Sequence, residues 1–496
     1  FELDNEIPMA DDTSNYYWNV SAGSEFQDPD DVEFSETSRG GQLIQEEINV
    51  FQADLRRDLF FGDHRGYVKF GAKLIGREST SDQDMIVYDG FDGEDDFLLT
   101  QVAAAGDPDF FREVRNGYTF GPYPSYGQSE RFFRDNESLF EINDSDTVAE
   151  SYGVDYSVDE DIEAAYVMGS VDIGTLTVVG GVRVEQTDLA FTAYDVVFVD
   201  GDFDGTPPQV KGRKDYTNWM PGLQARWALR DDVILRAAWT NTIGRASYEQ
   251  NVPFRIFEIE EVDDGVYEGE MELGNANLDP LESANYDLSV EWYLQPAGLL
   301  SAGIFYKDIE NPIFTRTVTI EEEEFEGRFY EELVILQPQN ADSGNILGLE
   351  FNYQQQFSML PGLFRGLGFA FSYTWTDSEA KVFDRDDELP FFLQSEHIGN
   401  IALFYELQGL ELRLAYAYRS EYLDTIAEDA AEDLYVDDHG QLDFKASYAF
   451  TDAISGFFQV QNITSEPLVY FSGDDSRLAE YEFYSWNLLA GMTLKF

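Results

Sequence analysis

The sequence predicts an all-β protein that forms a transmembrane antiparallel β-barrel. The first observation lies at the end of the chain, where apolar residues recur at every second position from Tyr484 and Trp486 through Leu488 to Phe496. The residues between them are mostly polar or small. Because side chains alternate faces along a strand, this segment has one apolar and one polar face. Such a terminal strand is typical of bacterial outer-membrane barrels.

The second observation is that the alternation recurs along the chain, for example in 68–74, 286–294, 347–354 and 410–419. A soluble sandwich also alternates, but its strands are usually shorter, about five or six residues. No run reaches the ~18 consecutive apolar residues of a membrane helix. A closed barrel is the other fold that leaves no backbone group unpaired in a bilayer, so the pattern favours the barrel.

About sixteen segments of the chain fit transmembrane strands. They are 16–26, 46–60, 65–82, 160–173, 177–197, 213–229, 232–246, 284–295, 299–317, 344–359, 367–382, 397–408, 410–424, 436–450, 453–469 and 482–496. The connectors between them alternate between short turns and long loops such as 83–159, 247–283 and 318–343. Bacterial barrels have short periplasmic turns and longer extracellular loops. We therefore expect every short turn at the periplasmic end.

Composition constrains the class further. The chain has 496 residues, no Cys, and 97 acidic against 31 basic residues, a formal net charge of -66. The acids concentrate between the strands, which favours solvated extracellular loops, or loops that attract cationic or metal-bearing ligands. No basic stripe is present and the negative field would repel phosphate, which argues against nucleic-acid binding. No linker divides residues 1–496, which we interpret as a single domain. The start lacks Met, and we expect that an export signal was removed or lies upstream.

Several segments carry family-like motifs at loop-to-strand corners. Residues 274–283, G-N-A-N-L-D-P-L-E-S, are similar to a G-N-P-N-L-K-P-E-x-S stretch, with Ala276 in place of Pro and Asp279 in place of Lys. Residues 219–223 and 240–245 resemble two further strand motifs, although Ala246 stands where Pro is usual. Asn340 with the glycines after it, residues 462–464, and the terminal Phe496 fit as well. In this order, the motifs resemble the barrel of TonB-dependent outer-membrane receptors.

The resemblance implies a non-enzymatic outer-membrane transport protein. It would take up a scarce nutrient such as a siderophore, a glycan or another small ligand, with the TonB energy-transducing complex, outer-membrane lipid and lipopolysaccharide as partners. Members of the family have a plug inside a 22-strand barrel. We find no plug-like run, so the plug and the first strands would lie upstream of Phe1. The alternative is a complete 16-stranded, cation-preferring passive porin.

Candidate sites are few. The chain has three His and no recognisable nucleophile, zinc or phosphate-binding motif, which argues against an enzyme. Ligand contacts in this family usually lie near the extracellular end of the lumen. By depth along the strands we select four residues, Tyr306, Trp375, Arg419 and Tyr422. The aromatic residues of 83–159 either cap the pore or pack on one another.

One motif suggests a metal. Asp200, Asp202 and Asp204 form the D-x-D-x-D-G half of a calcium loop, where alternate carboxylates converge on one hard cation. Lys211 stands where the bidentate Glu of an EF-hand would fall, which rules out a true EF-hand. A calcium-stiffened loop and a plain acidic hairpin tip both remain open. No other cofactor is expected.

Overall fold

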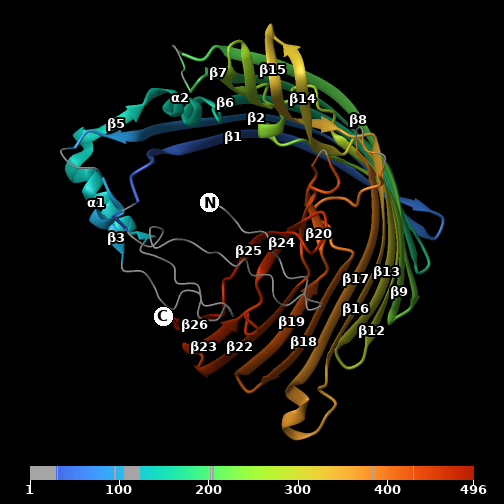
Figure 1. Ribbon diagram of the computed structural model, residues 1–496. Coiled ribbons are helices and arrows are strands. Elements are labelled where there is room, and N and C mark those ends of the chain that lie inside the picture. Colours follow the sequence, from blue (N-terminus) through green and yellow to red (C-terminus); the bar gives the residue numbers. More distant parts are fainter. Residues whose placement is uncertain are drawn as a thin grey trace.

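A curved antiparallel sheet dominates the computed structural model (Figure 1). The structure describes residues 29–495 except 31, 94–96, 105–122, 202, 204–205, 383–384, 386 and 428. Within the described residues, fifteen consecutive neighbours form the wall. They are β1 (Thr37–Phe61), β2 (His64–Phe91), β6 (Tyr156–Ile173), β7 (Leu176–Val199), β8 (Gln209–Arg230), β9 (Val233–Gly244), β12 (Leu281–Leu294), β13 (Gly298–Glu310), β16 (Ser343–Gln356), β17 (Leu367–Lys381), β18 (His397–Leu407), β19 (Leu410–Arg419), β22 (His439–Thr451), β23 (Ile454–Gln461) and β26 (Asn487–Leu494).

The wall confirms the predicted barrel class, and each of its strands coincides with one of the predicted segments. The segment 16–26 lies outside the described residues. Among the described residues, the outer strands β1 and β26 pair on one side only, with β2 and β23. The strand ends differ from prediction at the extracellular side. β13, for instance, ends at Glu310, because Asn311 has a φ of 55° and Pro312 has no N–H to continue the ladder.

The register sorts the wall into alternating rows. Six neighbouring strands, from β13 to β22, contribute one residue each to every row. One apolar row consists of Leu300, Tyr353, Phe371, Ile401, Tyr416 and Leu442. The adjacent row consists of Ser301, Asn352, Ser372, Asn400, Ala417 and Gln441. Adjacent rows lie on opposite faces of the sheet, so the wall has an apolar face and a polar face.

The extracellular connectors contain more regular structure than expected. The loops predicted at 247–283 and 318–343 are wrong as plain loops, because they hold two hairpins, β10 (Arg255–Asp263) with β11 (Val266–Leu273), and β14 (Ile313–Phe325) with β15 (Arg328–Asn340). β10 pairs in parallel with the end of β7, and β11 in parallel with β15. Runs of acidic residues such as Glu321–Glu324, which we interpreted as solvated loops, concealed these strands.

The other described elements also belong to the connectors. The helices are α1 (Tyr126–Asn136), α2 (Asp144–Tyr152) and α3 (Tyr248–Asn251), with 3-10 turns η2 (Leu99–Gln101), η3 (Glu137–Leu139) and η4 (Gly362–Gly366). The short strands are β3 (Ala103–Ala104), β4 (Tyr123–Pro124), β5 (Phe140–Asn143), β20 (Tyr422–Thr425), β21 (Leu434–Val436), β24 (Leu468–Ser472) and β25 (Leu478–Glu482). Of these short strands, β20, β21, β24 and β25 form a separate four-stranded sheet, in that order.

Candidate functional site

The polar face of the wall forms the lumenal surface of the site. Asn352, Ser372, Asn400 and Gln441 line a groove of about 190 Å³ on this face. On neighbouring strands, the Arg236 guanidinium donates to both carboxylate oxygens of Glu291, at 2.7 and 3.2 Å. These contacts follow the polar rows of the register. The lumenal surface is therefore rich in hydrogen-bonding groups, as the alternation predicted.

A buried ion network lies at the extracellular end of this face. Glu160 on β6 is 2% exposed and accepts a hydrogen bond from Arg77 on β2 and one from the Tyr248 hydroxyl of α3, both at 3.1 Å. Arg245, just after β9, lies 3.7 Å from Glu160 and donates to Glu185 on β7 at 2.7 Å. Burial raises the pKa of Tyr248 to about 12. The hydroxyl of Tyr248 therefore stays protonated and donates to the carboxylate.

The network fixes the β9–β12 connector against the wall. Val252 and the neighbouring ring of Tyr248 pack on Val158, Leu189 and Phe191, which are buried residues of β6 and β7. Ser247 caps α3, because its hydroxyl accepts from the Gln250 N–H. Apolar packing and buried ion pairs together hold this segment over the extracellular end of the wall.

A second group of connectors is held by Arg385. Its guanidinium donates to both oxygens of Asp433, at 3.0 and 2.9 Å, and to both oxygens of Asp387, at 2.8 and 2.7 Å. The Asp433 side chain is 2% exposed and also accepts from the Ala427 N–H. The hydrogen bonds that Arg385 donates to Asp387 and Asp433 raise the pKa of Arg385, and its contact with Asp387 lowers the pKa of that carboxyl.

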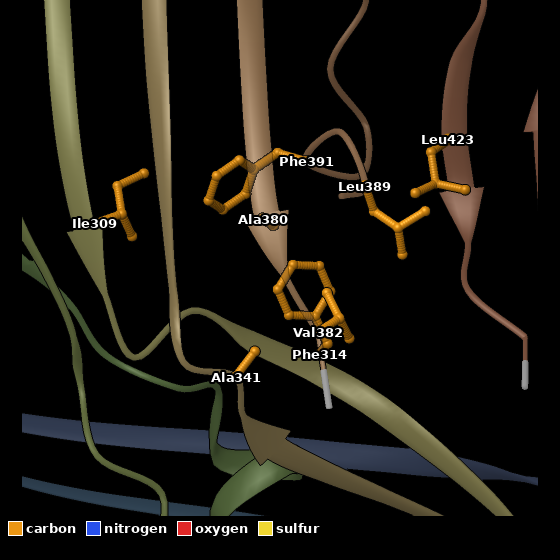
Figure 2. Close-up of a cluster of buried hydrophobic side chains, with 8 residues drawn as sticks. All are labelled: Ile309, Phe314, Ala341, Ala380, Val382, Leu389, Phe391 and Leu423. Atoms are coloured by element: carbon orange, nitrogen blue, oxygen red, sulfur yellow. The ribbon is translucent and has the colours of Figure 1, made fainter. Parts of the chain in front are cut away.

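A hydrophobic cluster that includes Val382 and Leu389, on either side of Arg385 in the sequence, joins six connectors and strand ends. Figure 2 shows Phe391 and Leu389 of the β17–β18 connector converging with Phe314 of β14 around Ala380. The rings of Phe314 and Phe391 are 6.2 Å apart. Leu423 of β20 is fully buried in the same cluster. The connectors thus have a core of their own, like a soluble domain.

The structure brings together two of the four residues selected as ligand contacts. The Arg419 guanidinium lies 4.7 Å above the ring of Tyr422 and donates to the Asp437 carbonyl at 2.9 Å. Tyr306 pairs with Tyr286 and Leu347, and Trp375 with Leu349 and His397, so the register places both in apolar rows. A ligand role for each of the four residues stays a prediction.

Carboxylates surround the Arg419–Tyr422 pair. Burial raises the pKa of Glu421, and the nearby Asp437 and Asp475 raise it further. The pKa of Asp437 is raised in the same way, by burial first and then by Asp438 and Asp475. The rim of the lumen here carries one cation among several mutually repelling anions.

The predicted calcium loop is described only in part. Asp202 and Asp204 lie outside the described residues. Asp200 has a φ of 53°, and its Oδ1 accepts from the Glu261 N–H at 2.7 Å, which ties the end of β7 to β10. Among the described residues, no three His, Asp or Glu side chains converge as metal ligands would. The calcium site stays a prediction.

Described aromatic residues of the 83–159 connector pack on one another. The rings of Phe97 and Phe132 stack at 4.2 Å, and Phe133 and Phe140 are 4.8 Å apart. A cavity of about 530 Å³ lies beside them and beside the start of β1. Self-packing, one of the two readings left open, therefore holds for these rings.

Sequence reasoning missed Arg385, Asp433 and Glu160. Arg385 stands in an acidic run that we interpreted as solvated. Its signal was a lone cation between the apolar Val382 and Leu389. Glu160 begins a predicted strand, and its partners in β2 and α3 are distant in sequence. The β2–β6 register pairs it with Arg77, and the fold of the β9–β12 connector brings Tyr248 to it.

Comparison with known proteins identifies the family. The model of the family described as "TonB dependent receptor-like, beta-barrel" matches residues 3–463. The chain belongs to this family. TonB-dependent receptors are proteins of the bacterial outer membrane, and that is the location of this protein. The resemblance seen in the sequence is confirmed. No curated protein matches the chain.

Solved structures of TonB-dependent receptors share the fold. The unliganded ferric citrate transporter FecA is 14% identical with a TM-score of 0.53, and the match covers 93% of this chain and 57% of that one. The ferric-catecholate import receptor Fiu of E. coli K12 is 12% identical, with a TM-score of 0.57 and coverage of 91% and 55%. The siderophore receptor PirA of Acinetobacter baumannii is 14% identical, with a TM-score of 0.54 and coverage of 91% and 55%. This chain spans a little over half the length of these receptors.

The helices of this structure are short. None that the structure describes is long and apolar enough to cross a bilayer.

Proposed function

We propose that this chain forms the wall and extracellular face of a receptor that takes up a small ligand across the outer membrane, with energy supplied by TonB. The family match over residues 3–463 carries this proposal. The structure adds support, because the wall has a polar lumenal face and its long connectors are folded and packed at one end. Such an arrangement suits capture of a ligand at the mouth of a lumen. The uptake step itself is not enzymatic.

The charge of the chain favours a neutral or cationic ligand. A net charge of -66 repels anions, and the connectors contribute acidic hairpins such as Glu321–Glu324 and Glu258–Asp263. FecA is named a ferric citrate transporter, Fiu a ferric-catecholate import receptor and PirA a siderophore receptor. A siderophore whose iron complex carries no net negative charge fits both facts. We propose Arg419 and Tyr422 as contacts, the cation and ring being adjacent at the rim.

Uptake assays test this function. Cells that express the parent gene, cells without it, and cells without TonB are given radioactive iron bound to anionic, neutral or cationic chelators. We expect accumulation of a neutral or cationic complex that requires both the gene and TonB. Arg419→Ala should reduce it, while Arg134→Ala on the exposed face of α1 should not.

A passive pore is the other reading, and the same assay separates it. Uptake that persists unchanged without TonB would favour the cation-preferring porin. Planar bilayers give a second readout, since a steady cation-selective current from the purified chain indicates an open channel. Closure of that pore by 16–26 against 482–496 involves residues outside those that the structure describes.

A further inference from the structure

The turn between β16 and β17 differs from every other described turn at the periplasmic end. The others are two or three residues long, and several contain acids, such as Asp63, Asp231 and Asp452. The β16–β17 turn spans 357–366, contains the 3-10 turn η4, and projects from the lower edge of the sheet as the orange loop in Figure 1. We refer to it as the long periplasmic turn. Its length needs an explanation other than chain reversal.

The long periplasmic turn exposes large apolar side chains. Met359 is 56% exposed, Leu360 39%, Leu363 68% and Phe364 64%. Exposed apolar groups gathered on one short segment mark an interaction surface rather than chance. Contact of these apolar side chains with water is unfavourable.

The base of the turn is closed and packed against the sheet. Its ends are joined by the Phe357 N–H, which donates to the Leu367 carbonyl at 2.8 Å, and Gly362 has a φ of +61°. Gly366 packs so closely on β18 that an added Cβ would lie 2.9 Å from the Leu407 Cβ. The apolar side chains are therefore presented from a fixed base.

The turn continues the lipid-facing surface of the wall. Leu367, the residue directly after the turn, pairs with Tyr405, and Tyr405 pairs with Leu412, in an apolar row at the periplasmic edge. The turn therefore leads directly into a row of the wall that faces the membrane. The lipid that already contacts the wall can also cover the turn, so no protein partner is needed.

The charge of the turn favours contact with anionic lipid. Arg365 is the sole charged residue in 351–376, within a chain of net charge -66. A cation beside exposed Leu and Phe suits the boundary between lipid tails and anionic headgroups, where apolar side chains enter the leaflet and a guanidinium meets phosphate. We propose that the long periplasmic turn lies in the periplasmic leaflet of the outer membrane and anchors the β16–β17 hairpin to anionic phospholipid.

Single-cysteine labelling tests the anchor, because the chain has no Cys of its own. Leu363→Cys is labelled with an environment-sensitive fluorophore in the full chain, folded into vesicles of phosphatidylglycerol and phosphatidylcholine. Asp452→Cys, in an exposed two-residue turn at the same end, is the matched control. Spin-labelled lipid and aqueous iodide serve as the two quenchers. We expect the ratio of lipid to iodide quenching to be at least severalfold higher at 363 than at 452.

Each other outcome contradicts the proposal. An equal or lower ratio at 363 means that the turn lies in water. Protection from both quenchers means that protein covers it, as a periplasmic partner would. Arg365→Glu should lower the ratio in vesicles with phosphatidylglycerol, whereas Arg365→Lys should preserve it. No difference between these variants would overturn the role of anionic lipid. These readouts do not depend on uptake, so they fail or succeed separately from the receptor function.

Discussion

The wall and the connectors place their apolar side chains in opposite ways. In the wall, residues such as Leu349, Leu403 and Leu488 are 46, 58 and 49% exposed on one face, while polar side chains occupy the other. In the connectors, Leu423, Leu333 and Phe257 are at most 1% exposed, inside clusters that resemble soluble cores. The difference shows that two solvents shaped one chain, lipid around the wall and water around the connectors.

Ionic groups follow the same division. Exposed pairs such as Arg56 with Asp58 occur on the wall, and buried networks around Glu160 and Asp433 lie at the extracellular end. Exposed pairs contribute little to stability, and buried ones are costly to break. Substitutions in the wall and in the connectors should therefore cost different amounts of stability, and the physical cause of each cost can be tested separately.

The largest effect is expected at the Arg385 clamp. Arg385→Met leaves the carboxylate of Asp433 buried without its cation, which should cost about 3–5 kcal/mol of local stability. Hydrogen exchange of β21 in the folded protein measures this opening free energy. Asp433→Asn added to Arg385→Met should recover part of the loss. Arg134→Met, which breaks an exposed pair on α1, should change little. Equal effects of the two Arg variants would show that the clamp is not a stabilising contact.

The next effect concerns lipid-facing positions of the wall. Leu349→Arg should cost about 2–4 kcal/mol, because a charge enters the hydrocarbon. Asn352→Arg, three residues away on the same strand and in the polar row, should be mild. Leu412→Arg and Ala415→Arg on β19 give a second pair, with a smaller cost at Leu412 than at Leu349, because Leu412 lies near the periplasmic edge of the wall. Refolding titrations in lipid give the values, and equal costs on both faces would contradict the face assignment.

A smaller effect is expected from pH at the acidic rim. The pKa values of Glu421 and Asp437 are raised in the folded connector, so the folded form binds protons more tightly than the unfolded form. Stability of this connector should therefore increase as pH falls from 7 through the raised pKa values, and decrease again as pH rises. Protease resistance at matched protease activity measures this. Glu421→Gln should raise resistance at pH 7 and flatten the profile, and Asp452→Asn should do neither.

The smallest effect is expected from calcium. Dense carboxylates repel one another, and divalent ions relieve that repulsion more than monovalent salt at equal ionic strength. Millimolar calcium should protect the connector around Asp200, Asp202 and Asp204 from proteolysis more than sodium does. Replacing Asp202 and Asp204 together by Asn should remove the difference. Equal protection by both salts would mean that only screening acts.

The sequence was most informative where one simple rule governs many residues. Alternation located all fifteen described wall strands, since a one-residue slip would invert both faces. It failed in the connectors. β10 and β15 pair in parallel with distant strands, and Arg385 meets Asp433 across two connectors. Such contacts depend on how the connectors fold over one another. The local alternation of apolar and polar residues contains no information about this.

The same limit applies to the candidate site. Depth along a strand selected Arg419 and Tyr422, which do meet, but also Tyr306 and Trp375, which lie in apolar rows. Depth and face are separate properties, and an aromatic residue fits a lipid-facing girdle as well as a lumenal contact. Whether each residue stands in step with the apolar or with the polar positions of its strand would have separated Tyr306 and Trp375 from the other two residues.

Thiol accessibility on one strand pair tests the division of faces most directly. Cysteines are placed singly at Asn352 and Ser372 in the polar row, and at Tyr353 and Phe371 in the apolar row next to it. In the folded protein in vesicles, a charged maleimide should react at 352 and 372 and fail at 353 and 371, while a lipid-soluble maleimide should reach 353 and 371. Equal reaction of the charged reagent at all four positions, or reaction at 353 and 371 alone, would contradict a wall with lipid on one face and a hydrated lumen on the other.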